Sequence, residues 1–191
     1  MRVEVSEGSI TNLEEYDSIP IAFDVGMVLD VSELGKDSGQ FVLTERSLDV
    51  PYTKDYDALS GEGPTNWTKL FDVSNWGMFV ARSEGRRVGG AVVAFNTPGM
   101  IVLAGRQDLA VLWDIRVSPH ARGQGVGTAL FQAAEDWAKA RGCHQLKVET
   151  QNINVPACRF YSRQGCALVA VDHFAYPDLS DEIQLFWNKD L

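Results

Sequence analysis

A glycine-rich loop before a helical pattern is the first stretch that could do chemistry. Residues 111–128 read VLWDIRVSPHARGQGVGT, with glycines at alternate positions between Arg122 and Gly127. Glycine lacks the Cβ that would keep a ligand away from the backbone, so the loop amides can turn toward one point. These amides lie at a helix N-terminus, where unpaired N–H donors and the helix dipole favour an anion, and the loop therefore predicts a phosphate site. A plain tight turn is the alternative interpretation.

Two other phosphate-binding motifs do not fit this loop. A Walker loop requires lysine and then Ser or Thr after its glycines, and no lysine follows Gly127. A dinucleotide-binding turn requires GxGxxG, whereas the glycines here have a different spacing. The remaining pattern, Arg-x-x-Gly-x-Gly after a strand, resembles the acyl-coenzyme A motif of the GCN5-related N-acetyltransferase (GNAT) superfamily. In that superfamily the loop amides hold the pyrophosphate of the coenzyme.

The run 146–166, LKVETQNINVPACRFYSRQGC, is the second stretch with chemical content. Its Asn154-x-x-Ala157-x-x-Phe160-Tyr161 segment resembles another motif of the superfamily, whose tyrosine lies near the thioester sulfur and donates a proton. The resemblance makes Tyr161 the expected general acid. An unperturbed phenol pKa of about 10 suits an acid that protonates a thiolate. Seen alone, a helical tyrosine is more often a packed ring with a surface hydroxyl.

Acetyl transfer to an amine also requires a base that leaves the amine uncharged and a group that polarises the carbonyl. Glu149 precedes Asn154 by five positions, as does a glutamate proposed as the base in ribosomal-protein N-terminal acetyltransferases of the superfamily. It is the first candidate for the base. Asp114 is the second candidate, because the pantetheine-binding strand of the family often carries an acid near this point. For both carboxylates, a bond to a backbone amide or to an arginine is the alternative.

The resemblance also implies how the coenzyme is held. Backbone groups of the strand before the loop pair with the pantetheine arm as an added strand would, and strand amides polarise the carbonyl. The loop amides take the pyrophosphate with Arg122 nearby, and Asn154 contacts the coenzyme or holds the loop. The residues expected to bind acetyl-CoA are Ile115, Arg116, Val117, Arg122, Gly123, Gln124, Gly125, Val126, Gly127, Thr128, Asn154, Ala157 and Phe160, and no metal is expected.

The C-terminal part narrows the resemblance. The run ETQNINVPACRFY, followed by DHF at 172–174 and DEI at 181–183, looks like the streptothricin acetyltransferases over about residues 110–188. This implies an acetyl-CoA-dependent N-acetyltransferase acting on a primary amine of a cationic small molecule, with a streptothricin-like antibiotic as the candidate and antibiotic resistance as the role. Cys166 departs from the usual phenylalanine, and residues 1–75, which shape the acceptor pocket in these enzymes, match no family pattern.

Two other functions stay open. A peptide or protein acetyltransferase, acting on an N-terminus or a lysine, would need an open groove for its substrate. A non-catalytic acyl-CoA sensor would bind the coenzyme and release no thiol with any acceptor. The presence of both Tyr161 and Glu149 counts against the sensor.

The hydrophobic pattern predicts the elements that position these residues. A strand over 108–117, a helix over about 125–141 and a strand over 145–150 follow in order, which predicts parallel neighbours joined by a crossover. A second helix has Asn154 as its cap and Pro156 in its first turn. One hairpin is expected to pair residues 76–82 with 87–96, and a second to pair 166–174 with 182–188. A further strand is expected at 40–48. Residues 51–66 are expected to form a loop that contains a short helix at 55–59.

Taken together, these elements and the resemblance imply an α/β (α+β) fold of the GNAT type. It has a central mixed, mostly antiparallel sheet with a splayed parallel strand pair and flanking helices. With 191 residues and 45% hydrophobic residues, one domain is expected. Residues 1–75 would be its variable acceptor side, and 76–188 its coenzyme-binding and catalytic core.

The charge distribution separates the first third of the chain from the rest. Residues 1–63 hold 14 Asp/Glu and 4 Lys/Arg, whereas 64–191 hold 12 and 13. The net charge of -9 argues against nucleic acid as a partner, because phosphate binding needs a basic surface. An acidic first third would attract a cationic acceptor, and carboxylates that only maintain solubility are the alternative.

Cysteine usage and hydropathy indicate a cytoplasmic protein. Cys143, Cys158 and Cys166 are odd in number and form no CxxC pair, so neither a disulfide framework nor a zinc site is expected. Buried packing is the preferred interpretation of Cys158. The chain shows no signal-peptide pattern at its start and no apolar run long enough to span a bilayer, so no membrane partner is expected. The edge strands of the last hairpin are compatible with a homodimer, which is common in the family.

Overall fold

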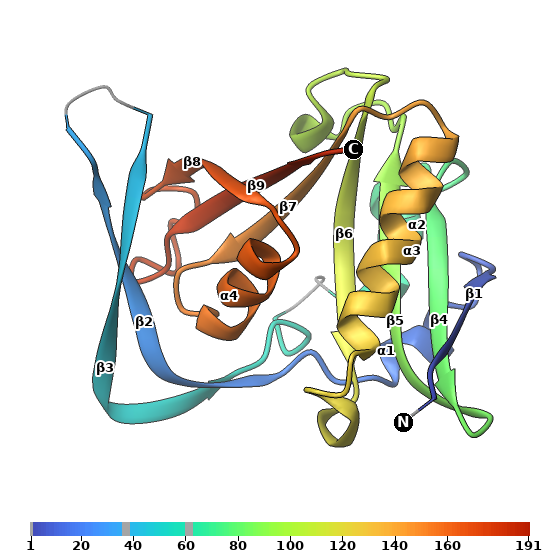
Figure 1. Cartoon of the computed structure of the whole chain (residues 1–191), viewed down its shortest axis with the longest axis horizontal. Helices are drawn as coiled ribbons and strands as arrows, with labels where there is room; N and C mark the ends of the chain where they lie inside the picture. Colours follow the sequence, from blue (N-terminus) through green and yellow to red (C-terminus); the bar gives the residue numbers. More distant parts are fainter. Residues whose placement is uncertain (1, 36–38, 60–62) are drawn as a thin grey trace. The chain divides into compact units, whose positions relative to one another are not determined.

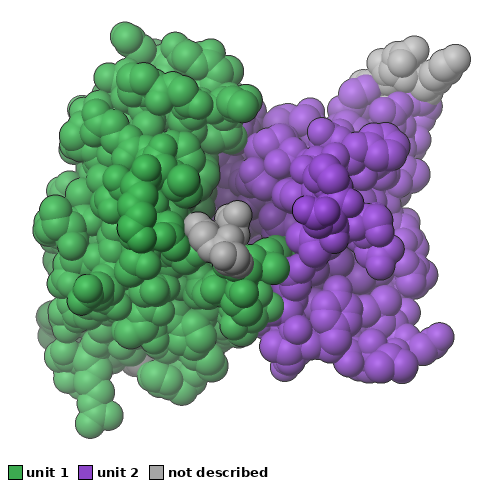
Figure 2. All heavy atoms as spheres, turned by 180° about the vertical axis from the view of Figure 1, so that it is seen from behind, with its two compact units in different colours: residues 1–22, 55–146, 191 green, residues 23–54, 147–190 purple. Residues whose placement is uncertain are grey.

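The computed structural model describes residues 2–35, 39–59 and 63–191 (Figure 1). The chain forms two compact units (Figure 2): unit 1 comprises residues 1–22, 55–146 and 191, and unit 2 comprises residues 23–54 and 147–190. The expected variable region, residues 1–75, is divided between the two units, and the assignment of one domain stays a prediction. The α-helices are α1 (Leu13–Asp17), α2 (Trp67–Leu70), α3 (Val126–Ala140) and α4 (Val155–Arg163), and the 3-10 turns are η1 (Pro64–Asn66), η2 (Ile101–Leu103) and η3 (Pro119–Ala121).

Within the described residues, seven strands pair in the order β1-β4-β5-β6-β7-β9-β8, and β2 and β3 form a separate ribbon. The pairs β1–β4, β4–β5, β5–β6 and β8–β9 are antiparallel. Strands β6 and β7 are neighbours joined by the expected crossover helix α3, and they form the parallel pair. The expected mixed, mostly antiparallel α/β fold is confirmed. The strands are β1 (Glu4–Gly8), β2 (Phe23–Glu33), β3 (Phe41–Lys54), β4 (Gly77–Ser83), β5 (Arg86–Phe95), β6 (Leu109–Val117), β7 (Gln145–Gln151), β8 (Ala167–Asp172) and β9 (Gln184–Asp190).

In unit 1, helices α3 and α1 lie on opposite faces of β5. A Cβ added at Gly89 would come within 3.1 Å of the Leu130 side chain of α3, and one added at Gly90 within 2.7 Å of the Tyr16 ring of α1. Successive residues of a strand point to opposite faces, so this glycine pair permits close packing on both sides. The β4–β5 register also shifts beside Gly89, and the carbonyl oxygen of Arg116 would lie 2.8 Å from its added Cβ. This glycine pair therefore coincides with a bulge and with a close backbone neighbour.

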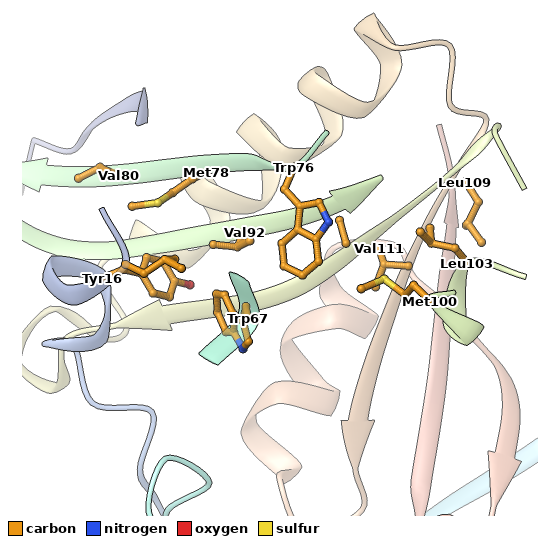
Figure 3. Packing of buried hydrophobic residues seen from close by; sticks show 12 residues of the cluster. Tyr16, Trp67, Trp76, Met78, Val80, Val92, Met100, Leu103, Leu109 and Val111 are labelled. Atoms are coloured by element: carbon orange, nitrogen blue, oxygen red, sulfur yellow. The ribbon is translucent and has the colours of Figure 1, made fainter. Parts of the chain in front are cut away.

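Aromatic rings fill the core of unit 1 on the face that carries α1 (Figure 3). Trp67, Trp76 and Trp113 contact one another with ring centroids 5.7 to 6.5 Å apart. The indole nitrogen of Trp76 donates to the hydroxyl of Thr97 at 2.8 Å, so its polar atom is satisfied inside the core. The buried members of this core are Leu13, Tyr16, Trp67, Trp76, Met78, Val80, Val92, Ala94, Met100, Leu103, Leu109 and Val111.

In unit 2, a smaller core joins the ribbon to the segment after β7. Val25 and Val28 of β2 pack with Ile153, and the partly buried Phe23 and Leu48 lie against them. Strand β7 alternates in burial, which directs one set of side chains inward and the other outward. Its buried residues are Leu146, Val148 and Thr150, and its partly exposed residues are Gln145, Lys147, Glu149 and Gln151.

The β2–β3 ribbon departs from expectation. Strand β3 does not end near residue 48 but continues through Pro51 to Lys54, so the predicted loop over 51–66 is wrong in its first four residues. The pairing register shifts between Val25 and Met27, which leaves residues 48–51 outside the ladder. Pro51 lies in this irregular stretch, where a missing N–H removes no ladder hydrogen bond.

The short helix predicted over 55–59 is also wrong. The segment is a turn in which the Asp55 carboxylate accepts a hydrogen bond from the Asp57 amide at 3.1 Å, and the Leu59 amide donates to the Tyr56 carbonyl at 3.1 Å. An aspartate that binds the backbone two residues later favours such a turn over a helix. Residues 60–62 of that predicted loop lie outside the described residues, and its last three residues form the 3-10 turn η1. The hairpins, α3, β7 and α4 are confirmed with boundary shifts of a few residues.

Candidate active site

The glycine loop of unit 1 leads from β6 into α3. Gly123 and Gly125 have φ angles of 72° and 85°, in the left-handed region that favours glycine. A Cβ at these two positions would meet no atom of the described residues within 4 Å, so the loop backbone borders open space. Gly125 is the N-cap of α3, its first turn holds no acidic residue, and no side-chain cap hydrogen bond is made there within the described part of the chain. The amides of Val126 and Gly127 are therefore placed to donate to an anion such as a pyrophosphate.

The polar side chains of the loop hold its backbone. The Arg122 guanidinium donates to the carbonyl oxygens of Val117 at 3.1 Å and Ala22 at 3.0 Å. The Gln124 side-chain amide donates to the His120 carbonyl at 2.8 Å. These side chains therefore hold the loop by hydrogen bonds to backbone carbonyls of the same unit. Contact of Arg122 or Gln124 with the coenzyme stays a prediction.

Asp114 lies inside a buried charge cluster of unit 1. The Tyr16 hydroxyl donates to its Oδ1 at 2.6 Å, and the Nε of Arg116 donates to its two oxygens at 3.0 and 3.2 Å. Burial raises the pKa of Asp114, while the Arg116 charge and the Tyr16 hydrogen bond act in the opposite direction. This carboxylate has the arginine partner that the alternative interpretation expected, and its role as a base stays a prediction.

Arg116 extends the cluster to the segment that follows β3. Its guanidinium donates to the Asp57 carboxylate at 2.6 and 2.8 Å and to the Ile19 carbonyl at 3.2 Å, and Asp17 lies 3.7 Å away. Only 1% of the Arg116 side chain is exposed. Burial lowers the pKa of Arg116, but the surrounding carboxylates outweigh this effect and the net shift is upward. The Arg116 guanidinium thus binds carboxylates of the protein itself, those of Asp57 and Asp114.

The strand residues expected to pair with pantetheine lie at the end of β6. Ile115 and Val117 stand opposite Ala91 and Gly89 of β5. The register shifts at Trp113, immediately before Asp114, and such bulges re-aim the side chains that follow. Pairing of these backbone groups with pantetheine stays a prediction.

In unit 2, the cap of α4 has its expected geometry. The Asn154 side-chain oxygen accepts a hydrogen bond from the Ala157 amide at 3.2 Å, with Pro156 in the first turn. This bond satisfies one of the amides that the helix leaves unpaired. Asn154 is a confirmed helix cap, and its contact with the coenzyme stays a prediction.

Tyr161 lies on α4 with its side chain buried. Its ring contacts the Phe160 ring at a centroid distance of 5.2 Å, with the two planes 67° apart. Its carbonyl accepts hydrogen bonds from the amides of Gln164 and Cys166, each at 3.0 Å, where the helix closes at Gly165. The Tyr161 carbonyl therefore takes part in closing the C-terminal end of α4.

Glu149 belongs to the same unit as Tyr161 and points out of the partly exposed side of β7. Its Oε1 accepts a hydrogen bond from the Tyr176 hydroxyl at 2.6 Å. The Gln151 side-chain amide donates to the same hydroxyl at 3.0 Å. Burial and the Glu149 charge raise the pKa of Tyr176 well above its usual range. Glu149 is thus held by a tyrosine.

Sequence reasoning missed two residues here, Tyr176 and Asn152. The sequence placed Tyr176 only in a turn, and its pairing with Glu149 spans 27 positions. Buried Asn152 bonds in three directions: its side chain donates to the Leu29 carbonyl at 3.1 Å and accepts from the Ile183 amide at 2.8 Å, and its carbonyl accepts from the Leu29 amide at 3.0 Å. A polar residue directly after an alternating strand was the available signal for Asn152.

Cys158 is a packing residue. It is buried, and burial raises the pKa of its thiol from 9.0 to about 11. The thiol lies 3.4 Å from the Thr150 hydroxyl, which in turn accepts from the Trp187 indole at 2.8 Å. A thiol held in its protonated form is a poor nucleophile, in agreement with the expectation for Cys158.

The acidic excess of the first third is partly neutralised inside each unit. Glu15 lies 3.5 Å from Arg82 and 3.6 Å from Arg87 in unit 1, and Arg159 donates to Glu45 at 2.7 Å in unit 2. Some of these carboxylates therefore serve as partners for arginines of the later part of the chain.

Two further observations concern the described ranges only. The helices there are all too short or too polar to traverse a bilayer. His, Cys, Asp and Glu side chains in the same ranges nowhere gather in a group of three suited to a metal ion.

Comparison with known proteins connects these features. The sequence profile of the acetyltransferase (GNAT) family matches residues 43–166, which include β6, the glycine loop, α3, β7 and α4. Streptothricin acetyltransferase A of Bacillus subtilis (strain 168) is 30% identical over 153 residues, which cover 79% of this chain and 80% of that protein.

Two solved structures share the fold over the whole chain. Nourseothricin acetyltransferase superposes with a TM-score of 0.76 at 25% identity, covering 100% of this chain and 99% of that one. A Bacillus anthracis (strain Ames) protein, provisionally assigned as a streptothricin acetyltransferase and solved with acetyl coenzyme A, superposes with a TM-score of 0.78 at 25% identity, covering 100% of both chains. The chain therefore belongs to the acetyltransferase (GNAT) family.

Proposed function

We propose that this acetyltransferase transfers the acetyl group of acetyl-CoA to a primary amine of a cationic small molecule of the streptothricin type. The similarity to streptothricin acetyltransferase A carries the proposal. The alignment covers 153 residues, and the segment from residue 76 to residue 191 is shorter than that. The similarity must therefore include part of the first 75 residues. The acceptor side is assigned to that region, so the similarity bears on the substrate as well as on the coenzyme.

The fit of the coenzyme rests on the loop of unit 1. Left-handed Gly123 and Gly125 leave the backbone uncovered, and the first-turn amides of α3 suit the pyrophosphate. The thioester supplies an activated acetyl group, and the protein has to position it and move two protons. The amides of Ile115 and Val117 are assigned to the carbonyl and the pantetheine arm.

Glu149 and Tyr161 are assigned the two proton transfers. A carboxylate accepts a proton from the ammonium group of the acceptor, directly or through water, so that the nitrogen lone pair can attack the carbonyl carbon. The C–N bond then forms, the C–S bond breaks, and the Tyr161 hydroxyl protonates the departing thiolate. The nitrogen loses its second proton to solvent, which leaves a neutral amide, and the Tyr161 phenolate regains a proton from solvent. Asp114 is the second candidate for the base, and its hydrogen bonds with Tyr16 and Arg116 rank it behind Glu149.

An acceptor screen with acetyl-CoA tests the proposal. Thiol release is measured with streptothricin, with simple amines and with peptides that offer a free N-terminus or a lysine, and acetylated products are identified by mass spectrometry. We expect turnover with streptothricin and with related cationic amines. Turnover with peptides alone would replace the proposal by peptide acetylation, and coenzyme binding in calorimetry without thiol release on any acceptor would replace it by a sensor.

A further inference from the structure

We infer that Tyr176 is a positioning residue for Glu149, whose hydroxyl holds the carboxylate in the orientation in which it accepts the amine proton. The inference rests on the proposed function, because Glu149 is the proposed base. Tyr176 lies in the connection between β8 and β9, and Glu149 lies on β7, all within unit 2.

The numbers of protons that the Tyr176 phenol and the Gln151 amide can donate determine the direction of their hydrogen bonds. A phenol has one proton to give and can accept in addition, whereas a side-chain NH2 group can only donate. The Gln151 amide donates to the phenol oxygen at 3.0 Å, and the phenol lies 2.6 Å from Glu149 Oε1. The phenol proton is therefore directed at the carboxylate, and Gln151 supports that direction.

The connection that carries Tyr176 is anchored to the rest of unit 2. Glu182 forms an ion pair with Lys54 at the end of β3, and both side chains are largely buried. The Ile183 amide donates to the Asn152 side chain at 2.8 Å, and the Asn152 amide donates to the Ile183 carbonyl at 3.0 Å. Because Asn152 directly follows β7, the connection is bound to the strand that carries Glu149.

The phenol also keeps its proton under working conditions. Burial and the nearby Glu149 charge raise the pKa of Tyr176, so the hydroxyl stays a donor throughout the pH range in which an enzyme turns over. The hydrogen bond occupies Oε1 of Glu149. Among the described residues, Oε2 receives no hydrogen bond from the protein, which leaves that oxygen to take the amine proton.

A double-mutant cycle tests the inference on the full-length enzyme. The variants are Tyr176→Phe, Glu149→Gln and their combination, and kcat and KM are measured for acetyl-CoA and for the acceptor found in the screen. Tyr176→Phe is expected to lower kcat about 10-fold and to leave the KM for acetyl-CoA within about 2-fold, because one hydrogen bond to a charged group is removed. In the Glu149→Gln background the same change is expected to have no further effect, because the residue acts through the carboxylate.

Each other outcome overturns the inference. If Tyr176→Phe lowered kcat equally in both backgrounds, Tyr176 would act independently of Glu149. If it left kcat unchanged in the wild-type background, Tyr176 would have no positioning role. Absence of turnover in the wild type with every acceptor would overturn the proposed function and this inference together, and it is seen before any variant is made. Ser180→Ala is the control, since it removes an exposed hydroxyl from the same connection between β8 and β9, and it should leave kcat unchanged.

Discussion

Arg116 donates two hydrogen bonds to Asp57, at 2.6 and 2.8 Å, across 59 positions of the chain. The same guanidinium donates to Oδ1 of Asp114, and the Tyr16 hydroxyl donates to the same oxygen. One buried arginine therefore links α1, the turn after β3 and strand β6 within unit 1. This link holds part of the expected acceptor side against the expected coenzyme strand.

The two members of this ion pair should not be equivalent in their effect on stability. Arg116→Met leaves the buried Asp114 carboxylate without its cation, and the expected loss in the free energy of unfolding is about 3–5 kcal/mol. Asp57→Asn leaves Arg116 with Asp114 and the Ile19 carbonyl, and the expected loss is about 1–2 kcal/mol. Urea unfolding followed by circular dichroism measures both losses. Equal losses would contradict this prediction, because they would show that losing the Asp57 charge costs as much as losing the whole guanidinium.

The parts of the fold predicted from sequence are those encoded by local pattern. Strand β7 alternates with a period of two, α3 carries apolar residues at helical spacing, and Asn154 with Pro156 marks the start of α4. Each signal lies within one element, so no knowledge of distant partners was required. The proposed catalytic residues Glu149 and Tyr161 were found because their motifs lie in these same elements.

The ribbon and the charge cluster could not be predicted in this way. Strand β3 is mostly exposed and contains Pro51, so neither alternation nor composition marked its full length. The partners of Asp114 lie 98 positions away at Tyr16 and two positions away at Arg116, and only the fold selects them. Pairing of Tyr176 with Glu149 is another tertiary contact that no local pattern encodes.

Close packing at Gly90 gives a prediction about stability. A methyl group at this position would come within 2.7 Å of the Tyr16 ring and 3.0 Å of the Phe79 carbonyl. Both neighbours are held inside the core, so Gly90→Ala is expected to cost about 1–3 kcal/mol. Thermal unfolding measures the loss. Gly26→Ala is the control, because its added Cβ would lie 4.0 Å from Pro51, and a comparable fall in Tm there would contradict the packing argument.

Cys158 should resist alkylation in the native protein. With its pKa raised to about 11, its thiolate fraction at pH 8 is about 100-fold lower than that of an unfolded thiol near 9.0. Iodoacetamide labelling of native and urea-unfolded protein, read by peptide mass spectrometry, compares the two rates. Folding favours the protonated thiol, so this contribution to stability is complete below about pH 9 and is lost as the pH rises through about 11. If Cys158 were labelled as fast in the native protein as in the unfolded protein, it would be a reactive cysteine and the packing role would be wrong.

The glycine loop gives a prediction about the coenzyme. Gly125→Ala places a methyl group in the open space before α3 at a φ of 85° and should raise the KM for acetyl-CoA about 10-fold. S-acetylpantetheine lacks the pyrophosphate, so its kcat/KM should stay within about 2-fold of the wild-type value. Gly99→Ala is the control for backbone strain, since its φ is 81° and its surroundings are equally open. A similar loss with both thioesters would mean that the loop does not bind the pyrophosphate.

Removing the Tyr161 hydroxyl should separate chemistry from binding. Tyr161→Phe keeps the ring that packs against Phe160, so the fold and the Kd for acetyl-CoA should change little. The proposed acid is lost, and kcat is expected to fall about 100-fold because the thiolate must then leave without a proton from the protein. Calorimetry measures the affinity, and thiol release with the acceptor from the screen measures kcat. Since Glu149 is intact in this variant, a normal kcat would assign the proton to another group and leave the proposed base untouched.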